Sequence, residues 1–267
     1  MQCDRCQSEQ FTKAGRDRQG RQLYCCAGCG RRITTRSLSA FRGYRFPDAV
    51  IALAVRSFLR FRLSYTDVVE LLAERGVAVD ARTIYDWVRA CTPHCIAAAH
   101  AHRSPIGQRW RVDETYLKIG KRWYYLFRAI DQHGQIIDVY LCAQRNTAAA
   151  EAVFETAMDA SPVPPTRVTT GHPLGEAKCY PPALRTRLAK VEHRTSKYLN
   201  NGLERDHHQL NGRMRLMRRF KTTASASNFC RGLTLIRNLG RDFSALTTAV
   251  SPRLRRATAW ATLTASL

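Results

Sequence analysis

The chain of 267 residues lacks any apolar run of about 18 residues, the length that a membrane-spanning helix requires. Its start also lacks the basic and then apolar pattern of a signal peptide, so we expect an intracellular protein. Acidic residues are scarce, because 21 Asp and Glu stand against 43 Lys and Arg and the formal net charge is +22. This imbalance argues against a generic metabolic enzyme and favours a polyanionic partner, with nucleic acid ahead of a membrane surface.

Cysteine is plentiful, but its placement argues against a disulfide scaffold. Five of the ten cysteines lie in the first 29 residues, and residues 1–45 hold ten basic and three acidic residues with few hydrophobic ones. Two C-x-x-C pairs are present, Cys3 with Cys6 and Cys26 with Cys29. Their spacing is typical of a zinc ribbon with a structural Zn²⁺. Cys25 is an alternative to Cys26. The alternative of unligated cysteines in a flexible arm is disfavoured, since a small segment without a hydrophobic core needs a bound metal or a cross-link to fold.

Residues 46–100 have helical periodicity. Two amphipathic stretches, 66–75 and 83–90, are joined through a turn that contains Gly76, and this arrangement suits a DNA-binding helix-turn-helix. The side chains expected to face DNA are Arg82, Tyr85 and Arg89. The alternative is an ordinary helical hairpin with a solvated charged face, and the net charge of the chain favours DNA contact.

Residues 108–142 change to strand character, since they are rich in aromatic and β-branched residues. We expect strands at 110–113, 123–130, 136–141 and 166–170, and helices at 146–158, 181–190 and 203–219. The segment 246–267 is basic and then rich in Ala and Thr, and it gives no structural prediction.

Two carboxylates stand out against this background. Asp113 ends an apolar strand, and Glu204 opens a helix in a segment, 185–221, with eleven basic and three acidic residues. Glu204 taken alone indicates a local ion pair. Together the two acids indicate a Mg²⁺ or Mn²⁺ site for phosphoryl transfer on DNA, because these ions prefer oxygen ligands. The basic residues expected to hold the phosphate backbone are Arg213, Arg215, Arg218, Arg219 and Lys221.

The chain resembles the DDE-type insertion-sequence transposases, and in particular the insertion-sequence-six family in its branch with an N-terminal zinc ribbon. The resemblance spans roughly residues 1–245 and is carried by Trp110–Tyr116, Trp123–Asp131, Tyr198–His207 and Arg213–Lys221. It implies an α/β fold: a ribonuclease-H-like core with a mixed five-stranded sheet over 101–245. A zinc ribbon (1–45) and a helix-turn-helix segment (46–100) precede this core, and a basic tail (246–267) follows it.

The resemblance also implies a function. Asp113 is the first catalytic acid of such an enzyme and Glu204 the third. The protein binds the terminal repeats of a mobile element, cleaves the DNA with Mg²⁺ or Mn²⁺ and joins it to target DNA. Because two ends must meet, it acts as a homodimer or larger assembly. We expect it in the cytoplasm of a prokaryote, associated with the nucleoid.

The second acid of the family is missing from its expected place. It should follow the strand that ends at Thr170, where this chain has Gly171. Glu176 is the only carboxylate between Asp159 and Glu192, and it is the candidate replacement. One alternative is therefore a catalytically inactive, element-derived DNA-binding protein or repressor. Another is a zinc-ribbon RNA-binding or transcription-associated factor, which would not explain the presence of Asp113 together with Glu204.

Overall fold

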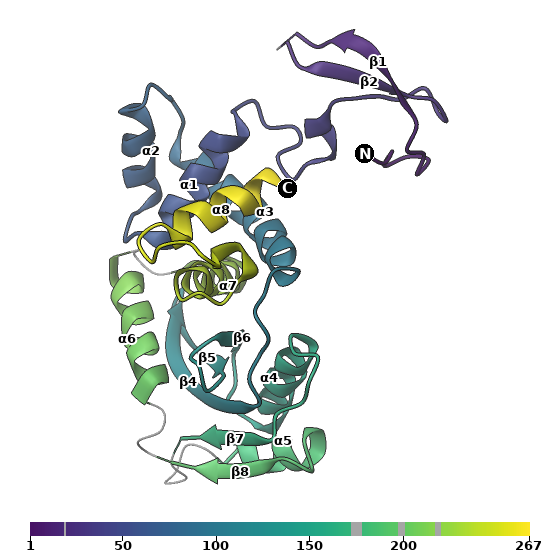
Figure 1. The fold of residues 1–267 in the computed structure, drawn as a ribbon. Coiled ribbons are helices and arrows are strands. Elements are labelled where there is room, and N and C mark those ends of the chain that lie inside the picture. Colours follow the sequence, from purple (N-terminus) through teal and green to yellow (C-terminus); the bar gives the residue numbers. More distant parts are fainter. Residues whose placement is uncertain (19, 172–177, 197–200, 217–219) are drawn as a thin grey trace.

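The computed structural model describes residues 1–18, 20–171, 178–196, 201–216 and 220–267. It begins with a small antiparallel sheet that stands apart from the rest of the molecule (Figure 1). The sheet consists of β1 (Phe11–Arg16), β2 (Gln22–Cys26) and β3 (Arg32–Ile33), and the 3-10 helix η1 (Thr35–Leu38) follows. This module corresponds to the predicted ribbon.

Three helices come next: α1 (Asp48–Arg60), α2 (Tyr65–Ala73) and α3 (Ala81–His100). Their starts follow from local sequence. Ser64 and Asp67 form a reciprocal capping box at the start of α2, and the carboxylate of Asp80 accepts the N–H of Thr83 at the start of α3. Gly76 supplies the left-handed conformation after α2, with φ at 73°. Helix α3 continues ten residues beyond the predicted stretch 83–90.

A five-stranded mixed sheet forms the centre of the remaining chain. Its strands are β4 (Arg109–Ile119), β5 (Arg122–Ile130), β6 (Ile136–Cys142), β7 (Arg167–Thr170) and β8 (Glu192–Thr195), in the order β6-β5-β4-β7-β8. The first three pair antiparallel, and β7 and β8 run parallel to β4. The predicted α/β class and mixed five-stranded sheet are confirmed, and this order is that of a ribonuclease-H-like fold. Strand β8 was not among the predicted strands.

Helices cover both faces of the sheet. Because side chains alternate along a strand, Val112 and Phe127 face α4 (Thr147–Asp159) and α5 (Tyr180–Arg187) in one hydrophobic cluster. Leu117 and Leu126 belong to the other cluster, with α6 (Asn201–Leu216) and α7 (Thr223–Gly240). Figure 1 shows α6 on the opposite side of the sheet from α4.

The same second cluster continues into the N-terminal helices, so the helical segment 46–100 shares its core with the sheet. Phe58 of α1, Trp87 of α3 and Phe229 of α7 are all buried in it, and the rings of Phe58 and Phe229 meet edge-on with centroids 5.8 Å apart. The C-terminal segment, which carried no structural prediction, forms η2 (Ala245–Thr247) and α8 (Arg255–Ala265). Trp260 of α8 is buried, and its indole N–H donates to the carbonyl of Ala52 in α1 at 3.0 Å.

In the described part of the chain, every helix is too short or too polar to span a membrane.

Candidate functional site

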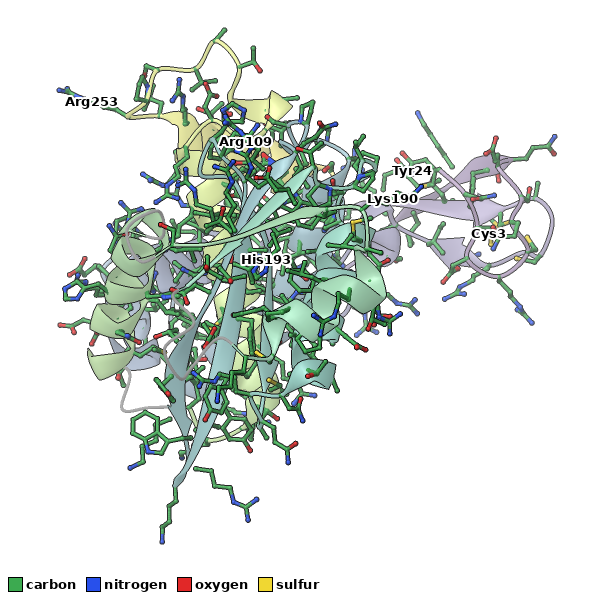
Figure 2. All side chains as sticks on the ribbon, turned by 90° about the horizontal axis from the view of Figure 1, so that it is seen from below. Cys3, Tyr24, Arg109, Lys190, His193 and Arg253 are labelled. Carbon is green, nitrogen blue, oxygen red and sulfur yellow. The ribbon has the colours of Figure 1, made fainter. Side chains whose placement is uncertain are left out.

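Four cysteines meet at the tip of the N-terminal ribbon, as the sequence predicted. The Sγ atoms of Cys3, Cys6, Cys26 and Cys29 lie within 4.8 Å of one another. Figure 2 shows the sulfur atoms gathered beside Cys3, far from the body of the molecule. Cys25 stands outside this cluster, because its Sγ is directed to the carbonyl of Gly30 at 3.5 Å. The alternative that Cys25 replaces Cys26 is therefore wrong.

The geometry of the cluster fits a tetrahedral metal ion. Zinc–sulfur bonds of about 2.3 Å place ligand sulfurs roughly 3.8 Å apart. In the ribbon, Cys3 and Cys29 are 3.6 Å apart and Cys6 and Cys26 are 3.4 Å apart, measured between Sγ atoms. Burial raises the pKa of Cys26, but hydrogen bonds from the backbone of Cys29 and neighbouring groups outweigh burial and lower it to about 6. A thiolate, the form that binds metal, is thus favoured at this position.

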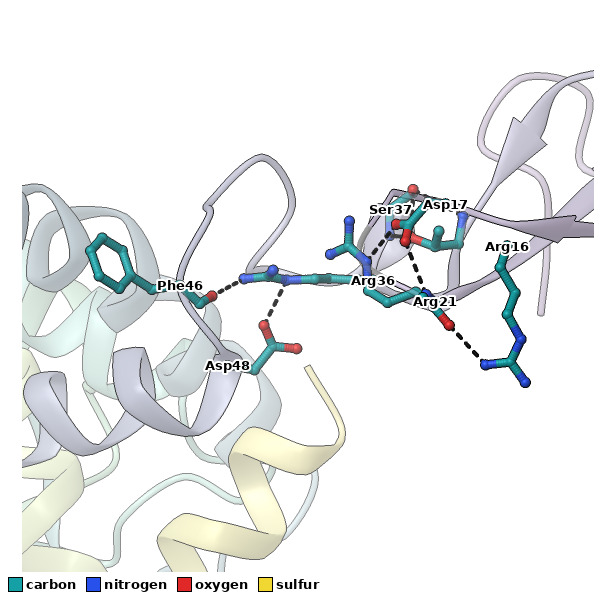
Figure 3. A network of polar contacts seen from close by, with 9 residues as sticks. Arg16, Asp17, Arg21, Arg36, Ser37, Phe46 and Asp48 are labelled. Atoms are coloured by element: carbon teal, nitrogen blue, oxygen red, sulfur yellow. Dashed lines mark hydrogen bonds and ion pairs between the residues drawn. The ribbon is translucent and has the colours of Figure 1, made fainter. Parts of the chain in front are cut away.

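Arginine side chains tie the ribbon to the helical part of the chain. Arg36 forms an ion pair with Asp48 at the start of α1, with 2.7 Å between Nε and Oδ1, and it also donates to the carbonyl of Phe46 (Figure 3). Within the ribbon, Arg21 pairs with Asp17 at 2.6 Å. A partly buried charge pair therefore links the 3-10 helix that follows the ribbon to the start of α1.

On helix α3, two of the three residues predicted to face DNA are exposed. The side chain of Arg82 is 75% exposed and pairs with Asp86 at 2.9 Å, and Arg89 is exposed as well. Tyr85 is half-buried, since its ring packs edge-on against Tyr65 and its hydroxyl lies 3.3 Å from that of Ser225. The outer face of α3 thus offers two arginines to a partner, with the tyrosine at the edge of the core.

Asp113 lies on the face of β4 that α6 covers. It is half-buried and stands opposite the buried Arg128 of β5 in the strand register. Leu203 and His207 of α6 are buried in this layer of the structure. Glu204 belongs to the first turn of α6, next to Leu203, and its side chain is outside the described part of the structure. The backbone therefore brings both acid-bearing segments to one side of the sheet.

The strand register identifies the position beside Asp113. Val112 of β4 pairs with Thr170 of β7 in parallel, so the next residues, Asp113 and Gly171, stand at adjacent positions where β7 ends. Adjacent residues on neighbouring parallel strands point to the same face. A side chain at 171 would therefore accompany Asp113, and glycine supplies none. Glu176, the candidate replacement, lies outside the described residues.

Sequence reasoning missed a polar cluster on the opposite face of β4. Glu114 forms an ion pair with Arg145, at 3.0 Å between Oε1 and Nη1, and it accepts a hydrogen bond from the hydroxyl of Tyr180. Burial, and then the charge of Glu114, raise the pKa of Tyr180 well above its usual value. The alternation of side chains along a strand could have revealed this cluster, because it puts Glu114 and Asp113 on opposite faces of the sheet. Glu114 is held by these partners and does not join Asp113.

One predicted DNA contact is wrong. Arg213 is only 6% exposed, and its guanidinium donates to the carbonyls of Phe58, Leu59 and Phe61 at the end of α1. Burial lowers the pKa of Arg213 to about 10, helped by neighbouring arginines. The residue completes the core rather than facing a phosphate. Lys221 is exposed, as a DNA contact requires. Arg218 and Arg219 lie outside the described residues, and so does the side chain of Arg215.

Comparison with known proteins adds independent evidence. A family model described as a DDE domain matches residues 107–242. The transposase for insertion sequence-like element IS431mec of Staphylococcus aureus strain Mu50 is 34% identical over 199 residues, which are 74% of this chain and 88% of the relative. The transposase for insertion sequence element IS257 in transposon Tn4003, also from Staphylococcus aureus, matches to the same extent.

Among solved structures, the HTLV-2 integrase catalytic core domain in complex with magnesium, in its dimeric form, is similar at 15% identity. The match covers 52% of this chain and 89% of that one, with a TM-score of 0.35. The sequence matches, rather than this structural overlap, therefore carry the comparison.

Proposed function

Because the chain belongs to the DDE-domain transposases of insertion sequences, we propose that it is a DNA transposase with Asp113 and Glu204 as two of its catalytic acids. The observation that carries this assignment is the placement of Asp113 where β7 ends, on the side of the sheet that the first turn of α6 covers. Acids from a central strand and a covering helix can converge on one phosphate only when both lie on that side.

Within the described residues, the acidic set near Asp113 is short of one member. The family is named for two aspartates and a glutamate, and a two-ion site for phosphoryl transfer uses carboxylate ligands. Gly171 supplies no oxygen beside Asp113, and Glu114 is held on the opposite face. The residues that the structure describes do not complete such a site, so we derive no step through a bound ion. We propose that the DNA-binding parts are functional and that glycine at 171 limits cleavage and strand transfer.

Phosphate binding rests on the exposed cations. Arg82 and Arg89 on α3, together with Lys221, contact duplex DNA at the element ends, and the net charge of +22 supplies the long-range attraction. Joining two ends requires two active sites, so we propose that the protein works as a homodimer or larger assembly on DNA.

The N-terminal ribbon holds a structural zinc ion in this proposal. Four cysteine ligands leave no open coordination position for chemistry, and the bound ion would stabilise a module with little hydrophobic core. Cys3, Cys6, Cys26 and Cys29 supply the thiolates, in line with the sulfur distances described above.

A specific experiment tests the assignment of the acids. The purified protein, its Gly171→Asp variant and the double variant Gly171→Asp with Glu204→Gln are incubated with a supercoiled plasmid that carries the DNA flanking the gene, in Mg²⁺ or Mn²⁺. Cleavage by Gly171→Asp and its loss in the double variant, with DNA binding unchanged, is the expected result. Cleavage that survives Glu204→Gln would remove Glu204 from the site.

The second candidate function is a DNA-binding protein or repressor without catalytic activity, and Gly171 is the observation that favours it. This function predicts salt-dependent DNA binding but no cleavage in either metal, even after Gly171→Asp.

A further inference from the structure

The hairpin formed by β4 and β5 exposes aromatic rings near its turn, and these rings are not part of the acidic site described above. Trp123 is 60% exposed and Tyr116 is 46% exposed, whereas the other three tryptophans, Trp87, Trp110 and Trp260, are buried. Tyr116 stands opposite Tyr125 in the register, so Tyr116, Trp123 and Tyr125 line one face of the β4–β5 hairpin. We call these three residues the aromatic strip.

Trp123 and Tyr116 are the exposed rings of the strip, whereas Tyr125 is half-buried against the hydrophobic cluster below it. The centroids of Tyr116 and Trp123 are 6.4 Å apart with planes at 87°, and those of Tyr116 and Tyr125 are 5.2 Å apart. Contact between large apolar rings and water is unfavourable, and a partner that covers the rings removes this contact. Their exposure therefore indicates a binding surface.

Cations surround the strip. Nζ of Lys118 lies 5.5 Å from the centroid of Trp123, and Cζ of Arg145 lies 5.8 Å from that of Tyr125. Lys121 and Arg122 at the turn are exposed. The sequence from Thr115 to Ile130 contains no Asp or Glu. Glu114, on the same face two residues before Tyr116, pairs with Arg145, so the cations of this surface that can meet a partner are Lys118, Lys121 and Arg122. Rings flanked by these cations match a nucleic acid, in which flat bases alternate with phosphates. A second copy of the same hairpin would instead bring like charges together.

The strip also lies close to Asp113 along the chain. Asp113 precedes Tyr116 by three residues in β4, about 10 Å along the strand, and this odd spacing puts their side chains on opposite faces of the sheet. Strand β7 pairs with β4 only from Arg109 to Val112, so the ladder with β7 ends before the strip begins. Further along the same edge, the carbonyl of Phe220 accepts the N–H of Gly120, so a DNA strand would have to cross from the face of Asp113 to the strip between Val112 and Ile119.

We propose that the aromatic strip stacks an unpaired base of the DNA strand whose phosphate lies at Asp113. This inference rests on the proposed function, and it adds a platform that holds the strand end next to the cut. Stacking tolerates any base, so the strip contributes strand positioning and not sequence recognition.

Tryptophan fluorescence tests this inference directly, because Trp123 is the exposed indole and the other three are buried. The full chain is titrated with a duplex bearing three unpaired 3′ nucleotides and with the same duplex bearing three abasic sites, which keep the phosphates. We expect quenching by the first DNA only. Trp123→Ala should bind the unpaired bases roughly 5- to 100-fold more weakly, the effect of losing one stack, and the abasic DNA unchanged.

Two matched variants complete the experiment. Trp123→Phe keeps a stacking ring and should retain most of the affinity, whereas Lys121→Ala should weaken both DNAs equally. Equal binding of both DNAs by Trp123→Ala and the unaltered protein would overturn the inference while leaving DNA binding intact. A DNA-independent dimer that Trp123→Ala dissociates in sedimentation would overturn it in favour of a protein interface. Failure to bind either DNA at low salt would refute the proposed function itself.

Discussion

Replacing Arg213 by Met separates a structural from a DNA-binding role for this residue. The guanidinium donates to three carbonyls at the end of α1, where a positive charge also complements the helix dipole. Hydrogen bonds from charged donors stabilise by about 1.5–3 kcal/mol each but do not add fully, and burying the cation offsets part of the gain. Because Met keeps an apolar stem, we expect a net loss of about 2–4 kcal/mol.

Thermal unfolding measures this loss. For a chain of this size, about 2–4 °C of Tm is lost per kcal/mol, so Arg213→Met should melt roughly 5–15 °C lower. Lys221→Ala is the matched control, because the exposed lysine should leave Tm unchanged and reduce the slope of log affinity against log salt by about 0.9. An Arg213→Met variant with unchanged Tm and a reduced salt slope would refute the structural role and restore the phosphate contact.

Two further predictions concern the ribbon and the sheet edge. Cys26→Ser should lose a bound zinc ion in native mass spectrometry, whereas Cys25→Ser should keep it; loss in both would contradict the ligand set. Burial lowers the pKa of His193, which lies 3.0 Å from the hydroxyl of Thr170. The unfolded chain therefore binds the proton more readily, and stability should fall as pH drops below about 6.5, the ordinary pKa of histidine. His193→Gln should reduce that fall in thermal melts between pH 5 and 8, and an identical pH profile would exclude the contribution.

The parts of the fold that follow from local chemistry were predictable. The C-x-x-C pairs predicted the meeting of four thiols, and the aromatic and β-branched runs predicted β5 and β6. They predicted only the start of β4, at 110–113, whereas the strand continues to Ile119. Helix α3 was predicted too short, because the pattern is interrupted by Pro93. The helix continues through it because Cys91 and Cys95 are buried in the core shared with α7.

Contacts between segments that lie far apart in the chain could not be predicted from the local sequence pattern. The run of basic residues after Glu204 indicated a phosphate-binding helix, but nothing local to Arg213 reveals that the end of α1 lies against it. The partners of Glu114 come from the loop before α4 and from α5, and they follow only once the sheet is assembled. The assignment of Asp113 and Glu204 as catalytic acids stays a prediction, as does the DNA contact of Arg82, Tyr85 and Arg89.

The most direct test of the central claim compares strand transfer by the unaltered protein and by Gly171→Asp. A pre-cleaved DNA end is supplied with a target plasmid and Mn²⁺, and the joined product is quantified. Because transfer depends on positioning of the reacting groups, we predict that Gly171→Asp joins DNA roughly 100-fold or more faster than the unaltered protein, and that adding Asp113→Asn abolishes the reaction. Equal rates for the unaltered protein and Gly171→Asp would contradict the claim that the residue beside Asp113 limits the site.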